Sequence, residues 1–207
     1  QEEGPINELF VRLNRSKALT GAEVRNAMAG PAPEVIREIA KHELFRVNIA
    51  FTVKRGQDLN AAAKILMFMH QNKLTETKKR NLDAFVRDMA KKKSDRLELA
   101  GRQVLDVLND MSEIFLPKDR LLASGGVFPI YFWFVRNTSE ANFIRLREFL
   151  VRFEKARKEN RKLINANPQD QRIDGELLQY DKFNRSTNDQ QSHEGRYKIL
   201  KKRFALD

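Results

Sequence analysis

Two of the three arginines and both asparagines in one segment could do chemistry; the segment otherwise has the pattern of two short apolar helices joined by a turn, LFVRLNRSKALTGAEVRNAMAG (residues 9–30). They are Arg12, Asn14, Arg25 and Asn26. Such side chains can fasten a helical hairpin by bonding to backbone groups, and they can equally face a phosphate. Both interpretations stay open at the level of sequence, so the four residues are candidates for a phosphate pocket.

Glu23, in the same segment, has a structural role that its spacing predicts. Thr20 stands three residues before it, which is the spacing of a capping box. In that motif the threonine oxygen accepts the backbone amide of the glutamate, and the glutamate carboxylate accepts the amide of the threonine. The spacing therefore predicts the start of a helix at Thr20.

The same segment resembles a known family. FVRLN (10–14), LT (19–20) and EVRNA (23–27) resemble the motif that closes the core of the GmrSD-type restriction-enzyme family of ParB/sulfiredoxin-like proteins. The C-terminal YDKFNRSTNDQQSHEGRYKILKKRF (180–204) is similar to the tail of shorter members. Resemblance at both ends implies that it extends over the chain, although the middle matches only as helices.

The resemblance implies nucleotide-dependent restriction of modified or foreign DNA by a longer parent protein. The family's Asp-Gly-Gln-Gln-Arg motif, which lies in an upstream mixed α/β domain, is absent here. The His-Asn-His nuclease of longer members is absent too, because His42, His70 and His193 lie far apart without its pattern. The chain would then be the helical C-terminal half of its parent, without a complete active site.

The resemblance also implies partners and a cofactor for that parent. The partners would be the missing N-terminal domain and DNA, and the parent would use a nucleoside triphosphate with Mg, whereas no cofactor is expected in this chain alone. The chain would supply one wall of a nucleotide or phosphate pocket, formed by Arg12, Asn14, Glu23, Arg25 and Asn26.

Charge and cysteine content point toward anionic partners in a reducing compartment. The 207 residues carry 39 Lys and Arg against 28 Asp and Glu, a formal net charge of +11. Such a balance favours nucleic acid, nucleotides or an acidic protein face. The chain has no cysteine, which excludes disulfides, thiolate metal sites and cysteine catalysis, and which suits the cytoplasm.

Three segments carry the excess of positive charge. Residues 78–102 hold nine basic against four acidic residues, residues 143–163 hold eight against three, and residues 196–203 hold five against none. Basic helix faces are often merely solvated, but three on one body could neutralise a DNA backbone without reading its sequence. The candidates for this nucleic-acid patch are Lys78, Lys79, Arg80, Lys91, Lys92, Lys93, Lys155, Arg157, Lys158, Arg161, Lys198, Lys201, Lys202 and Arg203.

The stretch RSTND (185–189) precedes the last basic segment. Arg185, Ser186 and Asn188 could hold a phosphate at a helix N-terminus, or could simply form a capped turn. The histidine spacing fits no metal site, and no Gly-rich phosphate-binding loop is present. No catalytic residue is predicted in this chain.

Helical periodicity dominates the chain, and an all-α fold of about nine or ten irregularly arranged helices is expected. The candidate caps are Asp58, Thr75 and Ser94. The uncharged run 121–135 is too short to span a bilayer and should be a buried helix. The expected helices lie near 6–13, 22–29, 33–45, 58–72, 76–92, 97–115, 127–136, 140–163, 174–184 and 194–204.

Two further features complete the expected organisation. Residues 1–164 should form a helical domain, beginning with the motif hairpin 1–30, and residues 165–207 a helical appendage packed on it. The only strand candidate is VNIAFTV (47–53). The aromatic set Phe128, Phe132, Trp133 and Phe134 is expected in the core rather than as a base-stacking platform.

Overall fold

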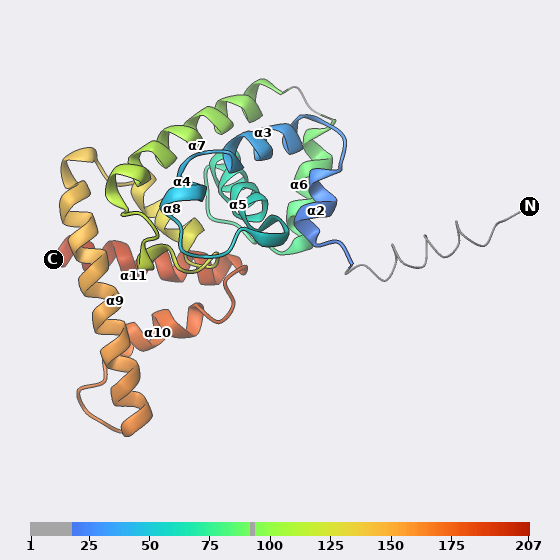
Figure 1. The fold of residues 1–207 in the computed structure, drawn as a ribbon. Coiled ribbons are helices and arrows are strands. Elements are labelled where there is room, and N and C mark those ends of the chain that lie inside the picture. The colour runs from blue at the N-terminus through green and yellow to red at the C-terminus, as the bar shows by residue number, and fades with distance from the viewer. Residues whose placement is uncertain (1–17, 92–93) are drawn as a thin grey trace, which may run out of the picture.

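A computed structural model describes residues 18–91 and 94–207. Within these ranges the fold is all-α, with ten α-helices, three short 3-10 helices and no strand, as the periodicity predicted (Figure 1). The elements are α2 (Gly21–Asn26), α3 (Pro31–Ala40), α4 (Leu44–Val47), η1 (Lys54–Gly56), α5 (Gln57–Gln71), α6 (Lys79–Met89), α7 (Asp95–Ile114), η2 (Arg120–Leu122), α8 (Phe128–Arg136), η3 (Glu140–Asn142), α9 (Phe143–Ala166), α10 (Gly175–Phe183) and α11 (Gln190–Leu206).

Helix α5 is the centre of the fold. Its residues 61–69 are all buried, and α2, α3, α6, α7 and α8 pack around it (Figure 1). A helix buried on every side needs an apolar or small surface all round, which AAAKILMFM (61–69) supplies except at Lys64. The short side chains at 61–63 let the neighbouring helices approach closely.

Helix α8 accounts for the uncharged run of the sequence. Residues 128–135 are buried along its whole length, so the aromatic set lies in the core as expected. Phe68 of α5 meets Trp133 edge to face, with ring centroids 6.0 Å apart. Within the described residues, no helix combines the length and the apolar character needed to cross a membrane.

The three C-terminal helices pack against this core and against one another. Helix α11 lies along α8 and α10, and α10 lies along the long helix α9 (Figure 1). Asp174 caps α10 by accepting the amides of Glu176 and Leu177 at 2.9 and 3.0 Å, and it also pairs with Arg203 of α11. These contacts connect the expected appendage to α8 and α9.

Several sequence-based boundaries and caps differ from the structure. Gly56 occupies the N-cap of α5 where Asp58 was expected, and Ser94 occupies the N-cap of α7 without a side-chain cap bond. Residues 47–53 form no strand; Ile49 makes only an isolated bridge with Asp119. The helix expected near 6–13 lies outside the described residues.

The start of α6 shows why one local prediction was wrong. The expected cap Thr75 lies four residues before the first helical residue, Lys79. The amide of Thr77 instead donates to the carbonyl of Asn188 at 2.8 Å, which holds this segment in an extended path. A long-range bond to the turn before α11 therefore delays the helix.

Gly195 of α11 offers a test of this packing, because a Cβ there would lie 2.3 Å from the Phe183 ring of α10. We expect Gly195→Ala to lower the free energy of unfolding by about 1–3 kcal/mol, as overpacking does. Gly175→Ala is the matched control, since a Cβ at Gly175 meets nothing within 4 Å. Urea denaturation measures both variants, and equal stabilities would contradict the observed α10–α11 contact.

Candidate functional site

A cavity of about 260 Å³ lies where α2, η1, the start of α5, the start of α6 and the turn before α11 meet. Among the described residues that line it, three are cationic and none is a carboxylate. The lining residues are Thr20, Gly21, Ala22, Arg25, Arg55, Gly56, Gln57, Asn60, Thr77, Lys79 and Asn188.

Arg25 of α2 forms one side of the cavity and is only 3% exposed. Its Nη1 donates to Oδ1 of Asp83 on α6 at 2.9 Å, and its Nη2 donates to Oδ1 of Asn60 on α5 at 2.5 Å. The guanidinium therefore bonds across to two other helices rather than to its own hairpin. A buried charge needs such partners, because an unpaired one is costly.

Lys79 lies at the mouth of the cavity and shares the carboxylate of Asp83 with Arg25. Its Nζ donates to Asp83 Oδ2 at 2.8 Å, and the lysine side chain is 65% exposed whereas that of Asp83 is 8% exposed. Burial acts to raise the pKa of Asp83, but the bonds from Lys79 and Arg25 outweigh it and hold that pKa below the usual range. One carboxylate thus supports two of the cations at the cavity.

Arg55 supplies the third cation from a strained loop. Its φ of 58° is unusual for a non-glycine residue, and the following Gly56 has a φ of 72°. This turn lets α2 approach closely, since a Cβ on Gly56 would lie 3.1 Å from that of Ala22. The Arg55 Nη2 donates to Glu23 at 3.3 Å and to the carbonyl of Ala18 at 2.5 Å.

The N-terminus of α5 opens onto the same cavity. Gly56 and Gln57, its N-cap and first residue, are both lining residues. The glycine cap has no side chain to accept the first amides, and of these the amide of Leu59 donates to Asp58 Oδ1 at 2.8 Å. Helix N-termini favour anions because their unpaired amides and the helix dipole both present positive charge. Together with the three cations, this makes the cavity electropositive.

Behind the lining lies a buried lysine. Lys64 is 5% exposed, and its Nζ donates to the side-chain oxygen of Asn188 at 2.8 Å. No carboxylate among the described residues pairs with it. Burial, followed by the charges of Arg196 and Arg25, lowers the pKa of Lys64 to about 8.

A chain of hydrogen bonds continues from Asn188 into the core. Thr77 Oγ1 lies 3.4 Å from Asn188 Oδ1 and 3.1 Å from His193 Nε2, and Arg196 Nη2 lies 3.2 Å from His193 Nδ1. A guanidinium can only donate, so Nδ1 of His193 accepts and the ring proton belongs on Nε2. Burial, then the charges of Arg196 and Lys64, lowers the pKa of His193 to about 3, which keeps the imidazole neutral.

The pocket candidates predicted in the N-terminal segment have different roles in the structure. The capping box is confirmed: Thr20 N donates to Glu23 at 2.6 Å, and Glu23 N donates to Thr20 Oγ1 at 3.2 Å. Asn26 accepts from Arg37 of α3 at 3.2 Å and does not line the cavity. Of this set only Arg25 is a lining residue, while Arg12 and Asn14 lie outside the described residues.

The cavity is also lined by residues that the sequence analysis had assigned to different candidate sites. Lys79 was a nucleic-acid patch candidate and Asn188 belonged to the proposed phosphate turn, yet both line the cavity with Arg25. Sequence reasoning missed Arg55, Asn60 and Lys64. The last left a signal, since it is the single charge within the apolar run 61–69.

Part of the predicted nucleic-acid patch is wrong. Arg157 is 3% exposed rather than a surface cation, and its guanidinium donates to Glu154 and Asp181. The misassignment arose because the partner Asp181 lies on α10, far along the sequence. Lys92 and Lys93 lie outside the described residues.

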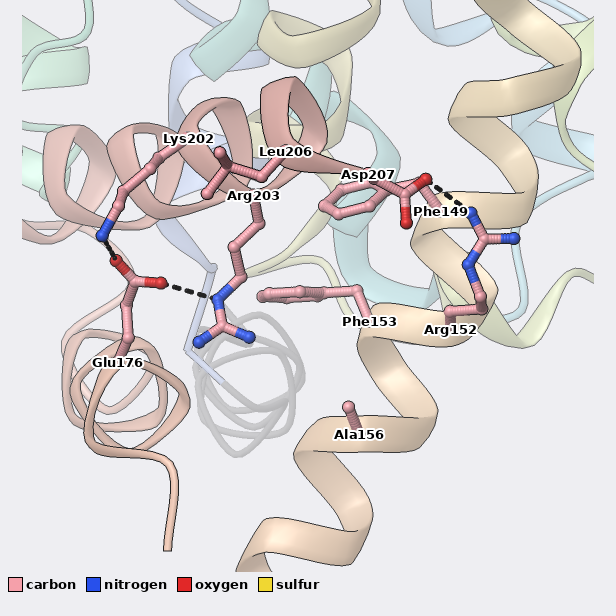
Figure 2. Close-up of a pocket in the computed structure, with 9 residues that line it drawn as sticks. All are labelled: Phe149, Arg152, Phe153, Ala156, Glu176, Lys202, Arg203, Leu206 and Asp207. Atoms are coloured by element: carbon pink, nitrogen blue, oxygen red, sulfur yellow. Dashed lines mark hydrogen bonds and ion pairs between the residues drawn. The ribbon is translucent and has the colours of Figure 1, made fainter.

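A second cavity, of about 400 Å³, lies between α9, α10 and α11, and its cations are all paired. Figure 2 shows Lys202 and Arg203 of α11 reaching the carboxylate of Glu176 at 2.8 and 2.7 Å, while Arg152 of α9 pairs with Asp207 at 2.5 Å. The rings of Phe149 and Phe153 form its apolar side. The carboxylates of Glu176 and Asp207 line this cavity together with its cations. At the cavity near Arg25, in contrast, the carboxylates that pair with the cations are not lining residues.

The remaining patch candidates are exposed but differ in their pairing. Lys78 pairs with Glu76 and Asp189, and Arg161 pairs with Asp181. Among the described candidates that the sequence proposed for nucleic acid or phosphate, those that are exposed and form no ion pair are Arg80, Lys91, Lys155, Lys158, Arg185, Lys198 and Lys201. Ser186 is exposed and does not line the cavity at Arg25.

Comparisons with known proteins add no relative to this description. The chain matches no family model, no curated protein and no solved structure. Within the described ranges, no group of three or more His, Asp or Glu side chains is placed to hold a metal ion. What the fold and the site define is an all-α protein with an electropositive cavity at its central helix.

Asp83→Asn tests the buried ion pair that supports the cavity. We expect it to lower the free energy of unfolding by about 3 kcal/mol at neutral pH, because Arg25 loses its buried counter-charge. Asp88→Asn, an exposed position on the same helix, is the control and should change stability by less than about 0.5 kcal/mol.

The pH dependence of the same variant gives a second readout. The folded pKa of Asp83 lies below its usual value of 3.8, so its contribution is present above that value and is lost as the pH falls through the lowered pKa. The stability difference between wild type and Asp83→Asn should therefore shrink in acid. A difference that is constant with pH would contradict an ionised Asp83.

Proposed function

We propose that the cavity at Arg25 binds a phosphate group of a nucleotide, and that the chain forms one wall of a nucleotide pocket in a nucleotide-dependent DNA-restriction or DNA-sensing protein. The observation that supports this is the set of three cations from α2, η1 and α6 around a cavity with no carboxylate lining, backed by the unpaired charge of Lys64. The family resemblance of the segment 9–30 supplies the wider context.

The residue types suit a phosphate. Arginine offers a planar fork of donors, lysine a compact charge, and asparagine amide donors that can complete the shell of oxygens. The N-terminus of α5 adds backbone amides and the positive end of its dipole. Asp83 and Glu23 lie behind Arg25 and Arg55, where they orient the cations without facing the ligand.

Hydrolysis would require groups from elsewhere in the parent protein. A triphosphate brings Mg, and Mg prefers carboxylate and water oxygens, which the described lining residues do not supply. We propose that the chain binds and positions phosphate, and that a further domain, of the kind that the family resemblance implies for the parent protein, would supply the metal ligands and the attacking water. The isolated chain should therefore bind a nucleotide without turning it over.

Lys79→Gln tests the proposed binding directly. We expect it to weaken the binding of ATP, measured by isothermal titration calorimetry at low salt, by about tenfold, since a charge-assisted hydrogen bond contributes about 1.5–3 kcal/mol. Arg80→Gln is the matched control, because Arg80 is exposed on the same turn and does not line the cavity. Equal losses in both variants would show only non-specific charge attraction, and no binding by the wild type would refute the proposal.

A second candidate function is a non-catalytic basic helical module that binds nucleic acid or an acidic protein face. It is favoured by the exposed, unpaired cations Lys155 and Lys158 on α9 and Lys198 and Lys201 on α11. If a DNA backbone contacts them, affinity in fluorescence anisotropy should fall steeply between low and moderate salt, as counterion release requires. An affinity that is unchanged by salt would argue against this surface.

A further inference from the structure

We propose that Lys64 determines which phosphates the cavity accepts: it favours a doubly charged phosphomonoester over a singly charged phosphodiester, and where its side chain is a neutral amine, that amine takes up a proton from solvent as the dianion binds. The proposal rests on the proposed function, because it assigns specificity within the same cavity. It concerns the charge of the bound group and not the identity of the molecule that carries it.

The geometry places Lys64 one layer behind the cavity. Asn188 lines the cavity and accepts the Lys64 Nζ proton through its side-chain oxygen at 2.8 Å, so a single side chain separates the ammonium from the ligand space. Asn60, one helical turn before Lys64 on α5, also lines the cavity. A charge at this depth acts on a ligand through a poorly solvated region, where screening is weak.

The two charged groups that act on Lys64 are both cations. Arg25 of α2 and Arg196 of α11 both act on it electrostatically, and neither Lys64 nor Arg196 pairs with a carboxylate among the described residues. Its hydrogen-bond partner Asn188 is neutral, as are Thr77 and His193, which follow Asn188 in the chain of hydrogen bonds.

The surrounding elements leave Lys64 without a close negative charge. Four carboxylates at these elements bond to other groups: Asp83 of α6 to Arg25 and Lys79, Glu23 of α2 to Arg55, Asp189 before α11 to Lys78, and Asp58 of α5 to the amide of Leu59. The buried side chains of α3, α7 and α8 that pack on α5 are apolar apart from Tyr131, which donates to Glu154.

A buried cation surrounded in this way is stabilised most by the ligand with the largest negative charge. A dianion in the cavity offsets the repulsion among Lys64, Arg25 and Arg196 more than a monoanion does. Because burial and the charges of Arg196 and Arg25 lower the pKa of Lys64 to about 8, part of the lysine is neutral at pH 8.5, and binding of a dianion should bring a proton with it.

The experiment compares methyl phosphate with dimethyl phosphate on the full chain at pH 8.5. Calorimetry is run in two buffers of different ionisation enthalpy, so that the protons taken up are counted. For the wild type we expect at least tenfold tighter binding of methyl phosphate, with uptake of a fraction of a proton per ligand. The fraction should fall toward zero at pH 6.5, where Lys64 is already protonated in the empty site, after correction for the ionisation of methyl phosphate itself.

Three variants separate charge from shape. Lys64→Met keeps the length of an apolar chain and should lose both the preference and the proton uptake, whereas Lys64→Arg keeps the charge and should retain the preference without uptake. Lys41→Met changes an exposed lysine at the C-cap of α3, which does not line the cavity, and should behave as wild type. Circular dichroism and urea denaturation establish that each variant is folded.

The outcomes distinguish this inference from the proposed function. If Lys64→Met binds both ligands and keeps the wild-type preference and proton uptake, the role of Lys64 is refuted while the phosphate pocket stands. If neither ligand binds the wild type or Lys64→Arg at all, the phosphate pocket itself is refuted. Loss of the preference in Lys64→Met with its retention in Lys64→Arg supports the proposal.

Discussion

Arg25 carries a full positive charge at a position where only 3% of the residue is exposed, and the fold around the cavity is arranged to neutralise it. Asp83 of α6 supplies the counter-charge, and Asn60 of α5 satisfies the other arm of the guanidinium. The three helices are thereby fixed relative to one another by bonds that hold only in one geometry. The cavity, its lining cations and the start of α5 all take their places from this arrangement.

The two cavities show what distinguishes a structural cluster of charges from a candidate site. Each arginine or lysine that lines the cavity between α9, α10 and α11 pairs with a carboxylate, as Arg203 does with Glu176 (Figure 2). Arg203 also pairs with Asp174. At the cavity near Arg25, the carboxylates that pair with the lining cations are not themselves lining residues. Lys64 and Arg196 bond only to neutral groups and pair with no carboxylate among the described residues. Buried positive charge without a counter-ion is unfavourable in an empty site and becomes favourable when an anion binds.

The sequence predicted the features that depend on neighbours along the chain. The capping box of Thr20 and Glu23, the aromatic core of α8 and the all-α class all follow from spacing and periodicity. Long-range contacts could not be predicted in this way. Asn188 stops α6 from beginning at Thr75, and Asp181 of α10 draws Arg157 into the interior.

Only single residues of the candidate site were predicted, because the site is assembled by long-range contacts. Arg25, Lys79 and Asn188 each stood out locally, but only the packing of α2, α6 and the turn before α11 brings them to one cavity. Lys64 was not among the predicted site residues, although a single lysine in the apolar run 61–69 indicates a buried charge that could act on a ligand. Arg55 could not have been found from the sequence, since its place depends on the left-handed backbone at η1.

The most direct measurement is a crystal structure of the chain soaked with tungstate, a heavy tetrahedral oxyanion that substitutes for phosphate and is located by its anomalous scattering. The account predicts a well-occupied tungsten position inside the cavity, within hydrogen-bond distance of Arg25, Lys79 and Asn188. Tungsten bound only at exposed cations such as Arg185 or Lys158, with the cavity at Arg25 empty, would contradict it.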